Sequence, residues 1–213
     1  VILSLNLMID KELQTLIAAK DYENAIALLI KEIEITEDEA RKSKLFTNLG
    51  TIECLKGEYK KGINTYQKAV KISSEEDKYM LYFFIANAYL ETGDIKKAEE
   101  QYIKSVKANN YYYHSAFKLG SLYLQEKQLT KAMVIYREMI KKFPKDDKLY
   151  EALGLIEQLN NNEKTSIEYY NKGLELNANS DSIKQKLASL YRQIGQLEKA
   201  NAIDRATKGE FKL

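Results

Sequence analysis

Small and bulky apolar residues recur along the chain at a fixed spacing. Small residues stand at Ala25, Gly62, Ala98, Ala132, Ser166 and Ala200, in steps of 37, 36, 34, 34 and 34 residues. In five of the six repeats another small residue stands twelve positions earlier, at Gly50, Ala86, Gly120, Gly154 and Ala188. Small side chains let two antiparallel helices approach closely while larger apolar residues fill the space around them. Each repeat is therefore predicted to be a helical hairpin.

A short turn is predicted between the two helices of each hairpin, with one residue in the left-handed conformation that ends a helix. Glycine adopts this conformation freely, asparagine tolerates it, and lysine adopts it with more strain. The residues at this position are Lys20, Gly57, Gly93, Lys127, Asn161 and Gly195.

A tyrosine follows the small residue of the second helix by four positions in four repeats, at Tyr66, Tyr102, Tyr136 and Tyr170. Four residues make about one helical turn, so each tyrosine shares a face with the small residue. This spacing favours core packing against the next hairpin over a cofactor-binding aromatic stripe.

The pattern resembles the tetratricopeptide repeat family. The residues that carry the resemblance are Leu49, Gly50, Gly57, Tyr59, Gly62, Tyr66 and Ala69; Ala86, Tyr89, Gly93, Ala98 and Tyr102; Leu119, Gly120, Tyr123, Ala132, Tyr136 and Pro144; Leu153, Gly154 and Tyr170; and Ala188, Tyr191, Gly195 and Ala200. The resemblance implies an all-α fold, a right-handed solenoid of about six hairpins. We expect one domain over residues 1–213, with repeats at about 6–42, 43–78, 79–112, 113–146, 147–180 and 181–213.

The terminal repeats depart from the pattern, as unpartnered ends of a repeat array do. Leu13 replaces the small residue in the first repeat, and Asp204 replaces the aromatic residue in the last. The two longer steps place extra residues at 35–43 and 72–78, both without proline or glycine. We interpret these stretches as extended helices or longer links within one solenoid.

Charge patterning argues against nucleic acid as a partner. The 33 basic and 31 acidic residues leave a net charge of +2, and the two signs alternate along the chain without a basic stripe. Such alternation is typical of solvated helix faces. No apolar run reaches the ~18 residues that a membrane-spanning helix needs.

The compartment is predicted from weaker signals. Cys54 is the only cysteine, which fits a reducing cytoplasm. The apolar residues 1–9 are expected to enter the first helix, with the stub of a removed export signal, and hence a periplasmic or exported protein, as the alternative. Richness in Lys, Asn, Ile and Tyr suggests a bacterial source.

The inventory of catalytic groups is poor, which predicts a protein that is not an enzyme. His114 is the only histidine, and the chain has no Walker-type, HExxH or GxSxG motif. Neither His114 nor Cys54 has a second soft ligand at a recognised spacing, so we expect no metal and no cofactor.

The resemblance implies that the first helix of each hairpin lines a concave wall that holds a peptide or a partner helix. Tracing the first-helix face opposite the packing face, in steps of three or four residues, gives a wall with an apolar, aromatic middle and polar flanks. An apolar patch on such a face indicates a binding site. The alternative is that curvature buries Phe83 and Phe117. The predicted partner-binding residues are Thr47, Thr51, Met80, Phe83, Asn87, Leu90, His114, Phe117, Ser121 and Leu124.

Family members that clasp the C-terminal carboxylate of heat-shock chaperones use Lys, Asn and Arg on three adjacent repeats. Asn48 matches one of those positions, whereas Asp10, Gln14, Met80 and Phe84 stand at the others. An apolar or aromatic peptide, or an amphipathic helix, fits this wall better.

The sequence therefore predicts a non-catalytic protein-interaction scaffold that binds a peptide or partner helix in its concave groove. One alternative is an assembly module that contacts partners or a second copy through the solenoid ends, and another is a fragment of a larger protein whose activity lies elsewhere. Asp204 makes the last face polar and favours a monomer, whereas Phe211 and Leu213 leave apolar surface that could support a homodimer.

Overall fold

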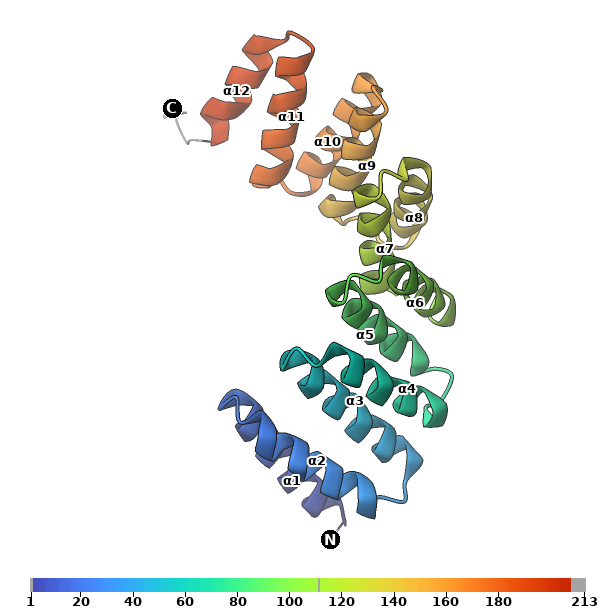
Figure 1. The fold of residues 1–213 in the computed structure, drawn as a ribbon. Helices are drawn as coiled ribbons and strands as arrows, with labels where there is room; N and C mark the ends of the chain where they lie inside the picture. The colour runs from blue at the N-terminus through green and yellow to red at the C-terminus, as the bar shows by residue number, and fades with distance from the viewer. Residues whose placement is uncertain (1, 111, 208–213) are drawn as a thin grey trace. The chain divides into compact units, whose positions relative to one another are not determined.

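The computed structural model describes residues 2–110 and 112–207, with side chains from residue 10 onward. Within these ranges the chain forms twelve α-helices and no strand. The helices follow one another as antiparallel pairs joined by tight turns (Figure 1). The predicted all-α solenoid of helical hairpins is confirmed, and the apolar stretch 2–9 lies within the first helix. The terminal Phe211 and Leu213 lie outside the described residues.

The twelve helices pair in chain order into six hairpins. Their bounds are α1 (Ile2–Ala18), α2 (Tyr22–Ile35), α3 (Glu39–Leu55), α4 (Tyr59–Ile72), α5 (Lys78–Glu91), α6 (Ile95–Ala108), α7 (Tyr113–Gln125), α8 (Leu129–Lys142), α9 (Asp147–Leu159), α10 (Glu163–Leu176), α11 (Asp181–Gln193) and α12 (Leu197–Thr207).

Two compact units divide the chain, at Val1–Ser115 and Ala116–Leu213. The first compact unit contains the hairpins α1/α2, α3/α4 and α5/α6. The second contains most of α7 and all of α8 to α12. The expectation of a single solenoid domain over the whole chain stays a prediction.

The turns inside the hairpins have the predicted backbone. Lys20, Lys127 and Asn161 have φ angles of 57°, 56° and 58°, and three glycines at the same position have φ between 76° and 81°. At the second turn the amide of Gly57 donates to the carbonyl of Cys54, and the amide of Glu58 donates to the carbonyl of Glu53, both at 2.9 Å. These bonds satisfy carbonyls that the end of α3 would otherwise leave unpaired.

The small residues lie at the helix–helix contacts, as predicted, and Gly50, Ala86, Gly120, Gly154 and Ala188 are all buried. A Cβ atom on Gly120 would lie 2.7 Å from Cζ of Tyr136, and one on Gly154 would lie 2.6 Å from Cδ1 of Tyr170. The tyrosine rings therefore pack on glycines of their own hairpins. The predicted contact with the next hairpin occurs in addition at Tyr66, which stacks on Phe84 of α5 with ring centroids 5.6 Å apart.

The two longer steps of the repeat have different structural outcomes. The first lengthens a helix, because α3 has 17 residues whereas α5 has 14. The second forms a link of residues 73–77 between α4 and α5. In the last hairpin, Asp204 of α12 is half-buried and forms an ion pair with Arg192 of α11. The polar residue that replaces the aromatic one therefore has a charged partner within its own hairpin.

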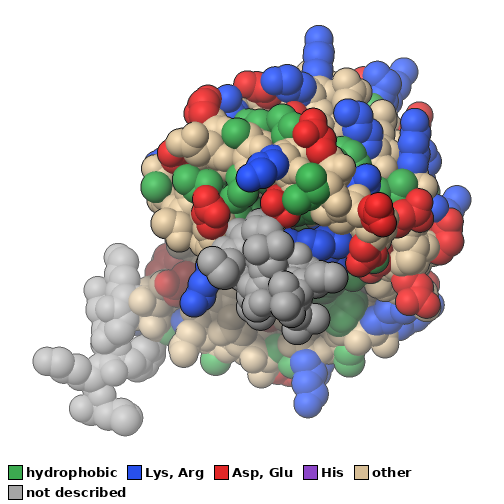
Figure 2. Space-filling view, turned by 90° about the horizontal axis from the view of Figure 1, so that it is seen from below, with side chains coloured by type: hydrophobic (Ala, Val, Ile, Leu, Met, Phe, Trp, Pro, Cys, Tyr) green, Lys and Arg blue, Asp and Glu red, His purple; other side chains and the backbone are tan. Residues whose placement is uncertain are grey.

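Charged side chains of both signs are interspersed over the face drawn in Figure 2. Some form exposed pairs along one helix turn, such as Lys97 with Asp94 at 2.6 Å and Lys141 with Glu138 at 2.5 Å. Exposed pairs of this kind contribute only ~0.2–1 kcal/mol each, so they act mainly as a solvated surface. Within the described residues, no helix combines the length and apolarity that crossing a membrane requires.

Candidate functional site

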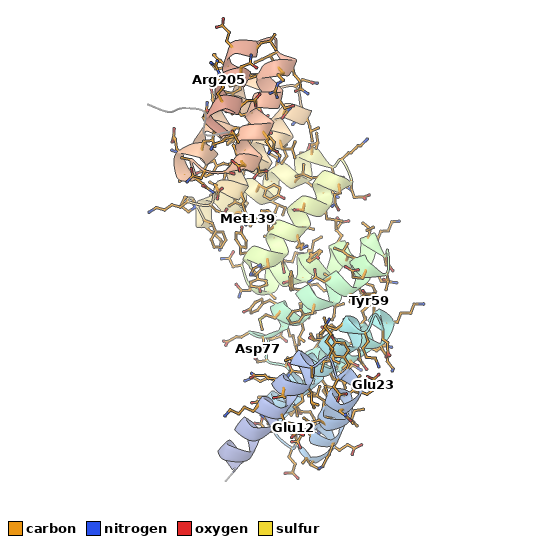
Figure 3. The ribbon with its side chains drawn as sticks, turned by 90° about the vertical axis from the view of Figure 1, so that its left-hand side faces the viewer. Glu12, Glu23, Tyr59, Asp77, Met139 and Arg205 are labelled. Atoms are coloured by element: carbon orange, nitrogen blue, oxygen red, sulfur yellow. The ribbon has the colours of Figure 1, made fainter. Side chains whose placement is uncertain are left out.

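A groove of about 730 Å³ lies between α3 and α5 in the first compact unit. One wall is the face of α3 that carries Glu39, Ala40, Ser43, Lys44, Thr47, Asn48 and Thr51. The floor and the other wall come from the end of α4, the link and α5, with Ile72, Ser73, Ser74, Asp77, Met80, Leu81 and Phe84. Asp77, labelled in Figure 3, stands at the start of α5. The groove therefore separates the first helices of two successive hairpins.

The irregular steps of the repeat build this groove. Seven of its fourteen lining residues belong to the extra stretches 35–43 and 72–78. Insertions in repeat proteins commonly map to one face of the array, often the binding face. The groove is thus a departure from the regular repeat.

The hydroxyl groups that line the groove donate their hydrogen bonds to other atoms of the protein. Thr47 and Thr51 donate to the carbonyls of Ser43 and Thr47, at 2.8 and 2.9 Å. Ser73 donates to the carbonyl of Ala69 at 2.7 Å, so Ser43, whose oxygen lies 2.6 Å from that of Ser73, must be the donor in their shared bond.

The last of these hydroxyls belongs to Ser74, which donates to Oδ2 of Asp77 at 2.7 Å. The protons of all five hydroxyl groups are therefore committed to bonds inside the protein, so a ligand meets only their remaining lone pairs, of which Ser73 and Thr51 each already use one to accept from Ser43 and Tyr66.

The part of the groove that α5 forms is apolar. Met80 is 40% exposed although it is a large hydrophobic residue. Leu81 is buried, and Phe84 is half-buried against the ring of Tyr66. An apolar strip that faces solvent beside polar groups is typical of surfaces that receive a partner.

The charged groups of the groove are few and exposed. Glu39 and Asp77 stand at the ends where α3 and α5 begin, and Lys44 stands one turn further along α3. Neighbouring Asp38 caps α3, since its Oδ1 accepts from the amides of Ala40 and Arg41 at 2.9 and 3.4 Å. Within the described part of the chain, neither Glu39 nor Asp77 forms an ion pair.

Three of the predicted partner-binding residues, Thr47, Thr51 and Met80, line this groove. Phe83, Asn87, Leu90 and His114 belong to the same compact unit but not to the groove lining. Phe83 is half-buried, with its ring centroid 5.9 Å from that of Tyr112 and 6.1 Å from that of His114. His114 is exposed, and Leu90 is half-buried.

The remaining predicted residues, Phe117, Ser121 and Leu124, lie in the second compact unit. Phe117 is half-buried and makes an edge contact with Tyr136, with ring centroids 5.7 Å apart. Ser121 donates to the carbonyl of Phe117 at 2.9 Å, and Leu124 is half-buried. A continuous surface from Phe83 to Leu124 stays a prediction.

A hydrogen bond that recurs in successive hairpins ties polar residues of the first helix to the core. The hydroxyl of Tyr66 lies 3.0 Å from Oγ1 of Thr51, and that of Tyr102 donates to Oδ1 of Asn87 at 2.6 Å. The same relationship joins Tyr136 and Ser121 at 3.1 Å.

These bonds immobilise the side chains of Thr51, Asn87 and Ser121, which the sequence assigned to the binding wall. The tyrosines themselves are largely removed from water. Burial raises the pKa of the Tyr136 hydroxyl to about 12, and it also raises the pKa of Tyr66, Tyr102 and Tyr170.

The sequence analysis did not assign nine of the groove residues to the binding wall: Glu39, Ala40, Ser43, Ile72, Ser73, Ser74, Asp77, Leu81 and Phe84. The available signal was the lengthening of two successive repeat steps to 37 and 36 residues. Because both insertions flank the same hairpin, their residues meet across one groove.

The surroundings of the lone histidine and cysteine bear on metal binding and on thiol reactivity. Among the described residues, no group of three His, Cys, Asp or Glu side chains is arranged to hold a metal ion. Cys54 packs so closely on Gly62 that a Cβ atom on residue 62 would clash with the Cys54 Sγ if nothing moved. Burial raises the pKa of the Cys54 thiol, which lowers its nucleophilicity near neutral pH.

Comparison with known families identifies the repeats. Tetratricopeptide repeat models match residues 81–112, 114–146 and 147–180. No curated protein matches the sequence significantly.

Solved structures share the fold at low sequence identity. A tetratricopeptide repeat protein from Parabacteroides merdae aligns with a TM-score of 0.73 at 18% identity, covering 97% of this chain and 80% of that one. MamA from Desulfovibrio magneticus RS-1 aligns with a TM-score of 0.69 at 17% identity, covering 78% and 93%. YrrB, described as a TPR protein with an unusual peptide-binding site, aligns with a TM-score of 0.62 at 16% identity, covering 80% and 86%.

Proposed function

Because this chain belongs to the tetratricopeptide repeat family, whose repeats build protein-interaction modules, we propose that it binds a segment of a partner protein in the groove between α3 and α5. The observation that carries the proposal is the position of both repeat insertions on this groove. Exposed Met80 and half-buried Phe84 supply apolar contact area, while Asn48 and the threonines supply polar groups.

The wider set of predicted residues extends this proposal. Phe83, Asn87, Leu90 and His114 would add contacts beyond the groove in the first compact unit. Phe117, Ser121 and Leu124 would do the same in the second. A peptide-binding site in YrrB supports a peptide as the ligand class, as does the poor fit of Met80 and Phe84 to a carboxylate clamp. The proposed role requires no catalytic step and no cofactor.

The test begins with the natural partner, captured from the native cell and identified by mass spectrometry. Purified partner is then titrated into the wild type and the variants by calorimetry. We expect Met80→Asp to weaken binding about tenfold or more, because a charge would be desolvated against the partner. Leu55→Asp is the matched control, since Leu55 is 57% exposed on α3 but does not line the groove. Equal affinities of the two variants would exclude the groove as the site.

An assembly role through the last hairpin is the second candidate. Leu197 at the start of α12 is 58% exposed, which leaves apolar surface that a second copy could cover. The ion pair between Arg192 and Asp204 makes part of this hairpin polar and favours the monomer that we propose. We further propose a cytoplasmic location, and a bacterial source in keeping with the bacterial proteins of similar fold from Parabacteroides and Desulfovibrio.

A further inference from the structure

We infer that the groove between α3 and α5 selects a basic, amphipathic segment of a partner protein, with Lys or Arg side chains held at Glu39 and Asp77 and apolar side chains held against Met80 and Phe84. This inference rests on the proposed function and specifies the chemistry of the ligand. It is the opposite of the selectivity for an acidic chain end that a carboxylate clamp would give.

The first argument concerns hydrogen-bond protons. The hydroxyls of Thr47, Thr51 and Ser73 donate to backbone carbonyls, and the hydroxyl of Ser43 donates to Ser73. Since Ser74 donates to Asp77, the groove hydroxyls have only lone pairs left for a ligand. At these hydroxyls a ligand that brings N–H donors finds partners, whereas a ligand carboxylate finds no donor.

The second argument concerns charge at the end of the groove where α3 and α5 begin. Both inserted stretches carry three successive acidic residues, at 37–39 and 75–77. Glu75 is paired with Lys78 at 2.5 Å, but Glu39 and Asp77 line the groove and form no ion pair within the described residues. The helix N-termini offset only about half an elementary charge each. The net charge at this end of the groove is therefore negative, and it attracts a cation.

Lys44 is the one cationic side chain in the groove lining, and it is exposed on α3. It stands beyond Glu39 along α3, away from the acidic end. Lys44 and Asn48, which lie on the same wall, can both donate hydrogen bonds to backbone carbonyls of the ligand. Because these carbonyls are uncharged, Lys44 does not need an acidic ligand. The groove thus presents carboxylates at one end, donors further along α3, and an apolar strip on α5.

The proposal is tested with three fluorescein-labelled peptides built from Leu and Ser plus Lys, Glu or Gln at the same positions. Fluorescence anisotropy with the full chain measures affinity, and the NMR signal of the Met80 methyl group reports whether the groove is occupied. We expect the Lys peptide to bind about tenfold more tightly than the Glu peptide, with affinity that falls as salt screens the charges. It should also shift the Met80 signal.

Two double variants test whether Glu39 and Asp77 cause the preference for the Lys peptide. Glu39→Gln with Asp77→Asn should weaken the Lys peptide about tenfold, since two partly exposed ion pairs are lost. Glu91→Gln with Glu100→Gln changes the net charge equally, at exposed positions outside the groove, and should leave affinity unchanged. Circular dichroism checks that both variants are folded, and the three-peptide comparison in the wild type decides the question if one is not.

Two results would overturn the inference. The first is that the Glu peptide binds more tightly than the Lys peptide and shifts the NMR signal of the Met80 methyl group. The groove would then still be a binding site, so the proposed function would stand. The second is that the groove variant and the control variant lose the same affinity for the Lys peptide. The peptide would then be attracted by the net charge of the protein and not by the carboxylates of the groove. Failure of the proposed function is a separate result: the natural partner would bind Met80→Asp with the same affinity as the wild type.

Discussion

The hydroxyl of Tyr102 on α6 donates a hydrogen bond to Oδ1 of Asn87 on α5 at 2.6 Å. The bond crosses the hairpin, joins a core ring to a residue of the predicted binding wall, and occupies the acceptor of the carboxamide. The Asn87 amide nitrogen makes no bond within the described residues, so it remains available as a donor.

Tyr102→Phe should lower the free energy of unfolding by ~1 kcal/mol, because one part-buried hydrogen bond is lost. Urea denaturation followed by circular dichroism measures this. Tyr59→Phe is the control, since the Tyr59 hydroxyl forms no hydrogen bond in the described part of the chain. If the two residues stabilise the fold through this hydrogen bond, Asn87→Ala should lower the free energy of unfolding much less in the Tyr102→Phe background than in the wild type.

Replacement of Gly120 should destabilise the second compact unit. A Cβ atom would lie 2.7 Å from Cζ of Tyr136, so the ring must move. Alanine gains up to ~1 kcal/mol of helix propensity over glycine, but overpacking costs ~1–3 kcal/mol, so we expect a net loss that grows from Gly120→Ala to Gly120→Leu. An unchanged melting temperature for Gly120→Leu would contradict this packing.

Gly57 provides the contrasting case. A Cβ there would meet nothing within 4 Å, but the residue has φ +81°. Gly57→Ala should therefore cost ~1–2 kcal/mol through backbone strain alone. Gly57→Asn should cost less, because asparagine tolerates the left-handed region, as Asn161 does with φ 58°. Thermal melts of the two variants measure the difference, and equal melting temperatures would argue against strain as the cause.

Alkaline pH should unfold the protein through its buried tyrosines. Burial raises the pKa of Tyr136 to about 12 from the ordinary 10.0, so the native state keeps a proton that the unfolded state releases. The stabilisation is complete below pH 10 and is lost as pH rises from 10 to about 12, with a slope of up to ~1.4 kcal/mol per pH unit for each such tyrosine.

Urea denaturation at a series of pH values measures this loss. Tyr66, Tyr102 and Tyr170 should add to the effect, because burial raises their pKa values too. Tyr136→Phe should flatten the pH dependence in this range. Stability that is constant from pH 9 to 12 would contradict the assignment of these hydroxyls to the core.

Sedimentation equilibrium should return a mass near 24.6 kDa across a concentration series at micromolar protein. The ion pair of Arg192 with Asp204 supports this expectation because it makes part of the surface of the last hairpin charged. A mass near twice that value, which falls when the exposed Leu197 is changed to Ser, would favour the assembly role through α12.

The hairpins and their turns were predictable from the sequence alone because their causes are local. A small residue at position 120 and a tyrosine at position 136 fix a close helix crossing, and a residue such as Gly57 that tolerates positive φ fixes the turn. Helical periodicity also indicated that Thr47, Thr51 and Met80 share the face opposite the core, and these residues line the groove.

Only the tertiary structure decided where the groove lies and what it can recognise. Its width depends on how the insertions at 35–43 and 72–78 separate α3 from α5, and the length of an insertion does not say whether it becomes helix or link. Its hydrogen-bonding character depends on contacts such as that of Ser43 with Ser73, thirty residues apart. Periodicity assigns a side chain to a face, but the partner of its proton is set by distances between helices, which the sequence does not encode locally.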